Sequence, residues 1–127
     1  MPVIRAIAVA LFSLAPPLAS QQPDSGVVRI TVEESVNGYL LDIVGATRKH
    51  SELRLGVSTR GALTLYRAAQ SLALVEDRDY VIPDDVKRLA VPILAHRIEF
   101  RGLIREGQRE RAKNVIGQIL DRTPVPK

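Results

Sequence analysis

Apolar residues recur at helical spacing through most of this chain, and that periodicity constrains the fold more than any other feature. The first periodic face comprises Val32, Val36, Leu40, Ile43, Val44 and Thr47. We expect Thr31 to cap this helix, with Glu33 and Glu34 in its acidic first turn. Gly38 and Gly45 weaken helix propensity, and we interpret them as points of close approach between helices rather than as breaks.

The second periodic segment follows a predicted loop over residues 51–57. Ser58 stands where a helix N-cap belongs, and TRGALTLYRAAQSLALVE then continues for about five turns. The apolar positions of this helix are Leu63, Tyr66, Ala69, Leu72 and Ala73, broadened by Leu65 and Ala68. A helix with so wide an apolar face is expected at the centre of a bundle.

Two more helices complete the predicted set. Pro83, followed by Asp84 and Asp85, is typical of a helix start, and Pro92 should kink or end that helix. Its expected buried residues are Val86, Leu89, Ala90 and Ile93. The last helix is expected over about Gln108–Leu120, and its expected buried residues are Ala112, Val115, Ile116 and Ile119.

The predicted fold class is therefore all-α, a small bundle of about four helices. Aromatic residues make up only 4% of the chain and Trp is absent, so the core would consist mostly of aliphatic side chains, which suits packed helices. We expect one helical domain over residues 27–121 and a tail over residues 122–127. A chain of 127 residues is long enough for one such domain.

Residues 1–25 differ from the rest and are not expected to pack into the bundle. Arg5 precedes an apolar run from Ala6 to Ala15, and two prolines follow. This resembles a secretory signal, although Pro17 is unfavourable for cleavage after Ala19. The run is too short and too interrupted to span a bilayer. The alternative is a spurious translated segment or a remnant of a longer gene.

The sequence offers no complete active site, and we predict no catalytic residue and no metal site in this chain alone. No glycine is followed at the right distance by Lys-Ser or Lys-Thr, so a P-loop is absent. There is no Cys, and His50 and His96 lack the spacing of a metal site. Asp84 and Asp85 could form a carboxylate pair, but compensation of the helix dipole explains them more simply.

Basic residues are concentrated toward the end of a chain whose net charge is +4. The spacing of Arg97, Arg101, Arg105 and Arg109 would align them on one helix face. A nucleic-acid-binding bundle is one interpretation. A solvated face, interrupted by glycine, explains the pattern better, and we do not expect nucleic acid as a partner.

Arg60 lies in the first turn of the helix that Ser58 caps. A cation is mildly unfavourable there, because a helix N-terminus is the positive end of the macrodipole. The same end attracts anions, so an arginine beside it would make a good phosphate contact. The simpler interpretation is an exposed arginine, or one paired with a neighbouring carboxylate.

Three stretches of the chain together resemble the C-terminal helical lid of MoxR-type AAA+ ATPases. They are YLLDIVGATRKH at 39–50, LRLGVSTRGALTLYRAAQSLAL at 53–74 and RDYVIPDDVKRLAVPILAHRI at 78–98. In that family a helix ends in an A-T-R-like triplet, and a loop with R-x-G-x-S-x-R leads into a long Ala/Leu helix. The nucleotide-binding core that precedes the lid in the family is absent from this sequence.

The resemblance implies that Arg60 is a sensor 2-like residue, which reads the phosphates of ATP bound to a core domain. This chain departs from the family at Thr59, where Pro is frequent, and at Gly61, where Ala is usual; both should loosen the first turn slightly. It also departs at Ile82, where Thr or Ser commonly caps the next helix. The missing cap could cost about 1 kcal/mol.

The leading hypothesis is an isolated lid of a MoxR-type ATPase, from a truncated or split gene, whose ancestral role is ATP-driven remodelling of proteins. ATP and Mg would then bind only with a core domain supplied by another chain. The resemblance implies AAA+ cores or neighbouring ring subunits as partners, and proteins with von Willebrand A-type domains. The alternative is an exported, non-enzymatic helical interaction module. The location is cytoplasmic under the first hypothesis, and secreted or periplasmic if residues 1–20 act as a signal.

Overall fold

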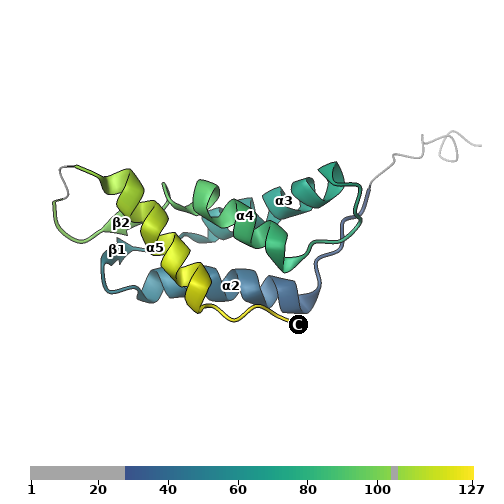
Figure 1. Ribbon diagram of the computed structural model, residues 1–127, viewed down its shortest axis with the longest axis horizontal. Helices are drawn as coiled ribbons and strands as arrows, with labels where there is room; N and C mark the ends of the chain where they lie inside the picture. The colour runs from purple at the N-terminus through teal and green to yellow at the C-terminus, as the bar shows by residue number, and fades with distance from the viewer. Residues whose placement is uncertain (1–27, 104–105) are drawn as a thin grey trace, which may run out of the picture.

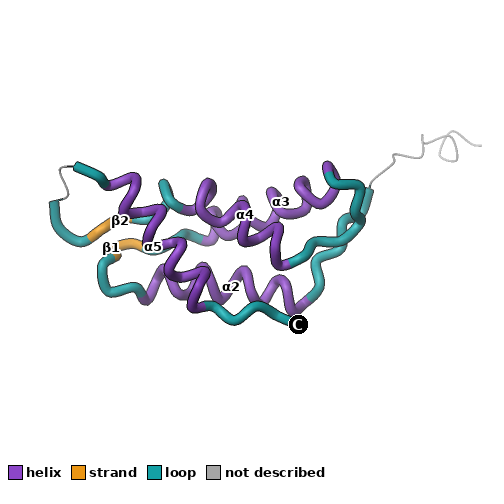
Figure 2. Tube along the Cα trace, in the orientation of Figure 1, coloured by secondary structure: helices purple, strands orange, loops and turns teal. Residues whose placement is uncertain are grey.

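A computed structural model of the chain describes residues 28–103 and 106–127. Most of this part is helical, and its helices are α2 (Glu34–Lys49), α3 (Thr59–Val75), α4 (Pro83–Leu94) and α5 (Gln108–Arg122). Two short strands, β1 (Leu53–Leu55) and β2 (Glu99–Phe100), pair antiparallel. The predicted all-helical bundle is confirmed, with this small sheet added (Figure 2). The predicted signal-like segment, residues 1–25, lies outside the described residues.

The helices form two layers that α5 ties together. Figure 1 shows α3 and α4 side by side in one layer and α2 in the layer below them. Helix α5 runs obliquely across α2 and α4. The β1–β2 pair lies at one end of the bundle, next to the start of α5. The strands were not predicted, since residues 51–57 were expected to form only a loop; Leu53 pairs with Phe100, a partner too distant in sequence for local patterns to reveal.

Each helix contributes at least one large, completely buried aliphatic side chain to a common core. These residues are Ile43, Leu65, Leu94 and Ile116. All four positions predicted to be buried in the last helix are indeed buried. In α3 the buried face is rotated from the predicted one, because Leu65 is fully enclosed whereas Leu63 is 47% exposed.

Thr31 does not cap the first helix, so that prediction was wrong. The helix begins at Glu34, and Glu33 occupies the N-cap position without a side-chain hydrogen bond. Thr31 instead forms a parallel bridge with Tyr80. Its backbone N–H donates to the Asp79 carbonyl at 2.7 Å, and its carbonyl accepts from the Val81 N–H at 2.9 Å. These bonds hold the Thr31 backbone extended, outside the helix.

Gly38 and Gly45 do not mark a close approach between helices. A Cβ atom built on either residue would meet nothing within 4 Å in the described structure. The glycine crowded by another segment's backbone is Gly56, where a Cβ would lie 2.6 Å from both the Cα and the N of Arg48. The close contact therefore joins the β1–α3 connection to the end of α2.

The arginine stripe predicted near the C-terminus does not lie on one helix. Arg97 follows α4, Arg101 follows β2, and only Arg109 belongs to α5. Arg105 lies outside the described residues. A turn and a strand separate these positions, because β2 pairs with β1 and so interrupts the helical path that the spacing suggested.

Candidate functional site

Ser58 is the N-cap of α3, as predicted. Its backbone is extended (φ −73°, ψ 166°), and its hydroxyl accepts a hydrogen bond from the Gly61 N–H at 3.2 Å. The Ser58 carbonyl accepts the first helical bond, from the Ala62 N–H at 3.0 Å. One donor of the first turn is thereby satisfied by the side chain, and α3 starts at a defined point.

Arg60 is the second residue of α3, and its side chain is exposed. Among the described residues it takes part in no ion pair, although its backbone carbonyl accepts a 2.8 Å hydrogen bond from Thr64 Oγ1. The alternative of an arginine paired with a neighbouring carboxylate is therefore not what this structure shows. Its predicted contact with phosphate stays a prediction.

A second arginine, Arg97, lies against the same first turn. A Cβ built on Gly61 would come within 3.3 Å of the Arg97 Cδ and 2.6 Å of the Val57 Cγ1. Gly61 thus leaves room for these two side chains, a packing reason for glycine that involves Arg97, a residue distant in the sequence. Arg97 also donates through Nε to the Ile93 carbonyl at 3.1 Å.

The surface beside this helix start is a shallow depression of about 400 Å³. It is lined by Leu55, Gly56, Ser58, His96, Arg97, Ile98 and Glu99. The one carboxylate in this lining, Glu99, is paired with Arg54. The basic residues Arg97 and His96 line the same depression, beside the positive end of α3. Sequence reasoning found Arg60 and Ser58 but gave Arg97 no part here; the HRI ending that contains it was the only signal.

The last turn of α2 holds the connection to α3 in place. Buried Thr47 donates through its hydroxyl to the Val44 carbonyl at 2.6 Å and accepts from the Val57 N–H at 2.9 Å. Arg48 donates through Nε to the Val57 carbonyl at 2.9 Å. Both backbone groups of Val57 are therefore bound by Thr47 and Arg48, which fastens the A-T-R triplet at the end of α2 to the residue just before the S-x-R motif.

The two carboxylates that could have formed a catalytic pair have different environments. Asp84 is exposed, whereas Asp85 is fully buried and its carboxylate accepts hydrogen bonds from Nη2 and Nη1 of Arg78, at 2.7 and 2.8 Å. The Asp85 carboxylate also accepts from the Ile82 N–H at 2.9 Å. This bond partly replaces the cap that Ile82 cannot supply. Asp85 is thus a structural residue of the α4 start.

The hydrogen bonds to Asp85 decide its charge state. Burial alone would raise the pKa of Asp85, but the bonds from Arg78 and from the Ile82 N–H outweigh burial and lower the pKa below its ordinary value. Arg78 is shared with Glu76, which in turn pairs with Arg88 at 2.6 Å. The whole cluster joins the α3–α4 turn to the first turns of α4.

The two histidines have different environments. His50 ends α2 and accepts through Nδ1 from the Glu52 N–H at 3.2 Å, whereas His96 is exposed after α4. Within residues 28–103 and 106–127, no cluster of three His, Asp or Glu side chains could hold a metal ion. In the same part of the chain, none of the helices combines the length and apolarity needed to cross a bilayer.

Comparison with known proteins gives the class of this fold. Residues 45–119 match the family model of the AAA lid domain. The chain is 37% identical over 106 residues to the uncharacterized protein YeaC of Bacillus subtilis, covering 79% of this chain and 31% of that protein. It is 40% identical over 76 residues to Chaperone MoxR1 of Mycobacterium tuberculosis, covering 53% of this chain and 20% of MoxR1.

A solved structure agrees with these sequence matches. A candidate ATPase from Cytophaga hutchinsonii superposes with a TM-score of 0.68 at 34% identity, covering 78% of this chain and 32% of that one. This chain belongs to the AAA lid domain family. Within the family it is similar to MoxR proteins, as the three motif stretches indicated. It spans at most 32% of the length of the relatives named here.

Proposed function

We propose that this chain acts as the lid of a MoxR-type AAA+ ATPase and that Arg60 contacts a phosphate of ATP bound to a core domain. The observation that supports the proposal most strongly is the exposed Arg60 guanidinium, which has no ion-pair partner within residues 28–103 and 106–127, at the capped start of α3, with Arg97 against the same turn. A guanidinium fork suits phosphate oxygens, and the helix dipole favours the same anion.

The remaining parts of an ATPase would come from a core domain. The sequence has no P-loop, and the described residues offer no carboxylate cluster for Mg, so we propose that a core domain supplies both the nucleotide site and the metal ligands. The direct partners would then be AAA+ core domains or neighbouring subunits of the ring. Proteins with von Willebrand A-type domains would be further partners of the assembled ATPase. The similarity to a protein named as a chaperone supports a role in protein remodelling. Dependence on ATP favours the cytoplasm.

The decisive experiment adds this chain to a MoxR-type core that lacks its own lid and measures phosphate release. Loss of one charge-stabilising contact typically costs about 3 kcal/mol, so we expect Arg60→Ala to lower the rate roughly a hundredfold. Arg60→Lys should rescue only in part, since Lys keeps the charge but not the fork. Arg67→Ala is the matched control, because Arg67 is also exposed on α3, two turns farther from the cap.

The melting temperature of the chain alone separates a functional role for Arg60 from a structural one. Arg60 has no side-chain partner among the described residues, so Arg60→Ala should leave the melting temperature nearly unchanged. Unfolding of this variant would show that Arg60 is structural. Equal phosphate release by Arg60→Ala and Arg67→Ala would contradict the phosphate contact directly.

A further inference from the structure

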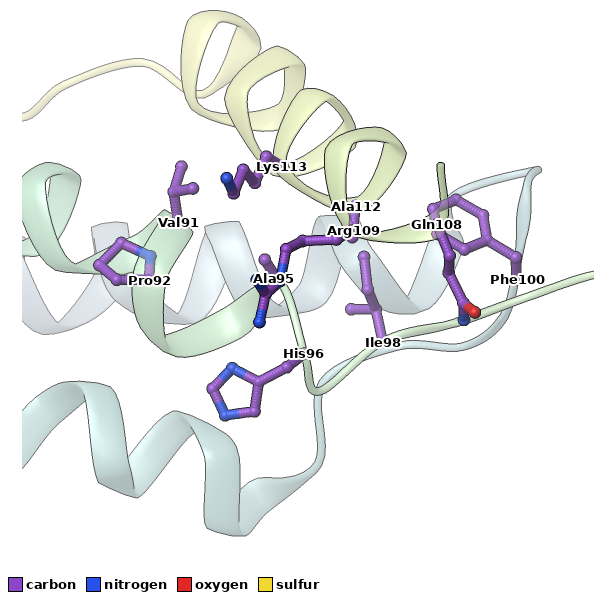
Figure 3. Close-up of a pocket in the computed structure, with 10 residues that line it drawn as sticks. All are labelled: Val91, Pro92, Ala95, His96, Ile98, Phe100, Gln108, Arg109, Ala112 and Lys113. Atoms are coloured by element: carbon purple, nitrogen blue, oxygen red, sulfur yellow. The ribbon is translucent and has the colours of Figure 1, made fainter. Parts of the chain in front are cut away.

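A second concave surface lies between the end of α4, strand β2 and the start of α5, and it shares His96 and Ile98 with the depression beside α3. It encloses about 620 Å³, within the range of ligand-binding pockets (Figure 3). Its lining residues are Val91, Pro92, Ala95, His96, Ile98, Phe100, Gln108, Arg109, Ala112 and Lys113. We call this surface the α4–α5 groove.

The floor of the α4–α5 groove is apolar and firmly held. Ile98, Phe100 and Ala112 are 8%, 5% and 3% exposed, so little of each remains open to solvent. The guanidinium carbon of Arg111 lies 5.1 Å from the Phe100 ring centroid, and Arg111 also pairs with Glu52. Because the Phe100 ring is already held in place, it loses little conformational entropy when a ligand binds, and this favours affinity.

The edge of the α4–α5 groove is basic. The ionisable residues among its lining are His96, Arg109 and Lys113, with no Asp or Glu in the set. Figure 3 shows Arg109 and Lys113 reaching from α5 toward α4. Arg109 joins no ion pair among the described residues, and Lys113 pairs only with exposed Glu110, a contact of the weak kind. Both cations are therefore available to a ligand.

We propose that the α4–α5 groove binds an extended segment of a partner protein in which apolar side chains alternate with carboxylates. The apolar floor would take the aliphatic side chains, and the basic edge would pair with the carboxylates. Charge complementarity steers such a segment to the groove and fixes its direction. The proposal is independent of Arg60, which takes no part in the groove.

The test measures fluorescence anisotropy of a short fluorescein-labelled peptide in which glutamate alternates with leucine, added to the full chain. The double substitution Arg109→Gln with Lys113→Gln should weaken binding roughly tenfold, since two exposed ion pairs are lost and each contributes only modestly. Arg122→Gln with Lys127→Gln is the matched control, because it removes the same charge from exposed positions at the other end of α5 and in the tail. This control should bind like the unchanged protein.

Two altered peptides test the basic edge and the apolar floor of the α4–α5 groove separately. Glutamine in place of glutamate, and serine in place of leucine, should each weaken binding roughly tenfold if both the edge and the floor contribute. Amide shifts in nuclear magnetic resonance spectra should then concentrate at Ala95, Ile98 and Ala112. Full circular dichroism signal from the double variant confirms that lost binding is not lost folding.

Three results would overturn the proposal. Binding unchanged by the double substitution would place the peptide elsewhere. Tighter binding of a single-stranded oligonucleotide than of the glutamate–leucine peptide would make the groove edge a nucleic-acid surface. A concentration-dependent dimer in sedimentation, abolished by the same double substitution, would identify a second copy of this chain as the occupant.

Discussion

The Val57 backbone N–H donates a 2.9 Å hydrogen bond to the hydroxyl of Thr47, ten residues earlier in the chain. Val57 directly precedes the Ser58 cap, so this bond ties the last turn of α2 to the first turn of α3. The position of Arg60 therefore depends on a buried residue that is not on its own helix.

Replacing Thr47 by valine should destabilise the fold by about 1–3 kcal/mol. The valine keeps the shape but leaves the buried Val57 N–H without an acceptor, and an unmet buried donor carries a desolvation penalty of this size. Urea denaturation of the purified chain measures the difference. Thr64→Val is the control, because the Thr64 hydroxyl bonds to Arg60 in an exposed part of α3 and its loss should be nearly neutral. Equal effects of the two substitutions would contradict the importance of the Thr47–Val57 bond.

Two glycine-to-alanine substitutions should act in opposite directions. Gly56→Ala would place a Cβ 2.6 Å from the backbone of Arg48, so the β1–α3 connection must shift and stability should fall. Gly38→Ala meets nothing within 4 Å inside α2 and should raise stability by about 0.5–1 kcal/mol. Thermal melts of both variants provide the measurement. A stabilising Gly56→Ala would show that the contact is not tight in solution.

Asp85 should make the fold sensitive to acid. Because folding lowers the pKa of Asp85, its carboxylate stabilises the fold above its unfolded pKa of about 3.9, and that stability is lost as the pH falls through the folded pKa. Asp85→Asn should cost about 3 kcal/mol near neutral pH, since it weakens the Arg78 pair and leaves a partly buried cation. Denaturation at a series of pH values tests this, and the variant should lose less stability than the parent between pH ~5 and ~2.

The matched control for Asp85 is Asp84→Asn. Asp84 is exposed in the same first turn of α4, so its replacement should change stability by a few tenths of a kcal/mol at most. If both substitutions produced the same acid profile, the buried Arg78–Asp85 pair would not be responsible for it.

Removing residues 1–25 should leave the helical signal and the cooperative melt intact, because the periodic pattern begins near Val27. Removing residues 1–32 should instead destabilise the domain. The longer deletion loses the Thr31 bridge to Tyr80 and the hydrogen bond from Gln70 Nε2 to the Ile30 carbonyl at 2.9 Å. Circular dichroism with thermal melting separates the two. Loss of folding on the shorter deletion would contradict the predicted domain boundary.

Local sequence signals predicted the helices well, because a cap or an apolar period involves only neighbouring residues. Ser58 and Pro83 begin their helices as expected, and α5 buries the predicted residues. The failures depend on contacts between distant segments. Thr31 pairs with Tyr80, the crowding at Gly56 comes from Arg48, and β2 interrupts the arginine spacing by pairing with β1.

The candidate site follows the same rule. Ser58 and Arg60 could be singled out because a helix start and an arginine are both visible in one short stretch. Arg97 reaches that helix start only through the packing of the segment after α4 against Gly61, and the α4–α5 groove arises from three separate segments. Nothing in a single sequence shows which distant side chains meet at a surface.

The Thr31 bridge has a mechanical consequence. Two backbone hydrogen bonds fasten the chain at Thr31 to the turn between α3 and α4, before α2 begins. A force applied to the chain before Val28 would therefore act first on the α3–α4 turn. It would reach α2 along the backbone only after the two Thr31 hydrogen bonds had broken. This anchor lies at the end of the bundle where α2 begins and α3 gives way to α4 (Figure 1), so a force on the preceding segment would reach all three helices at that one end.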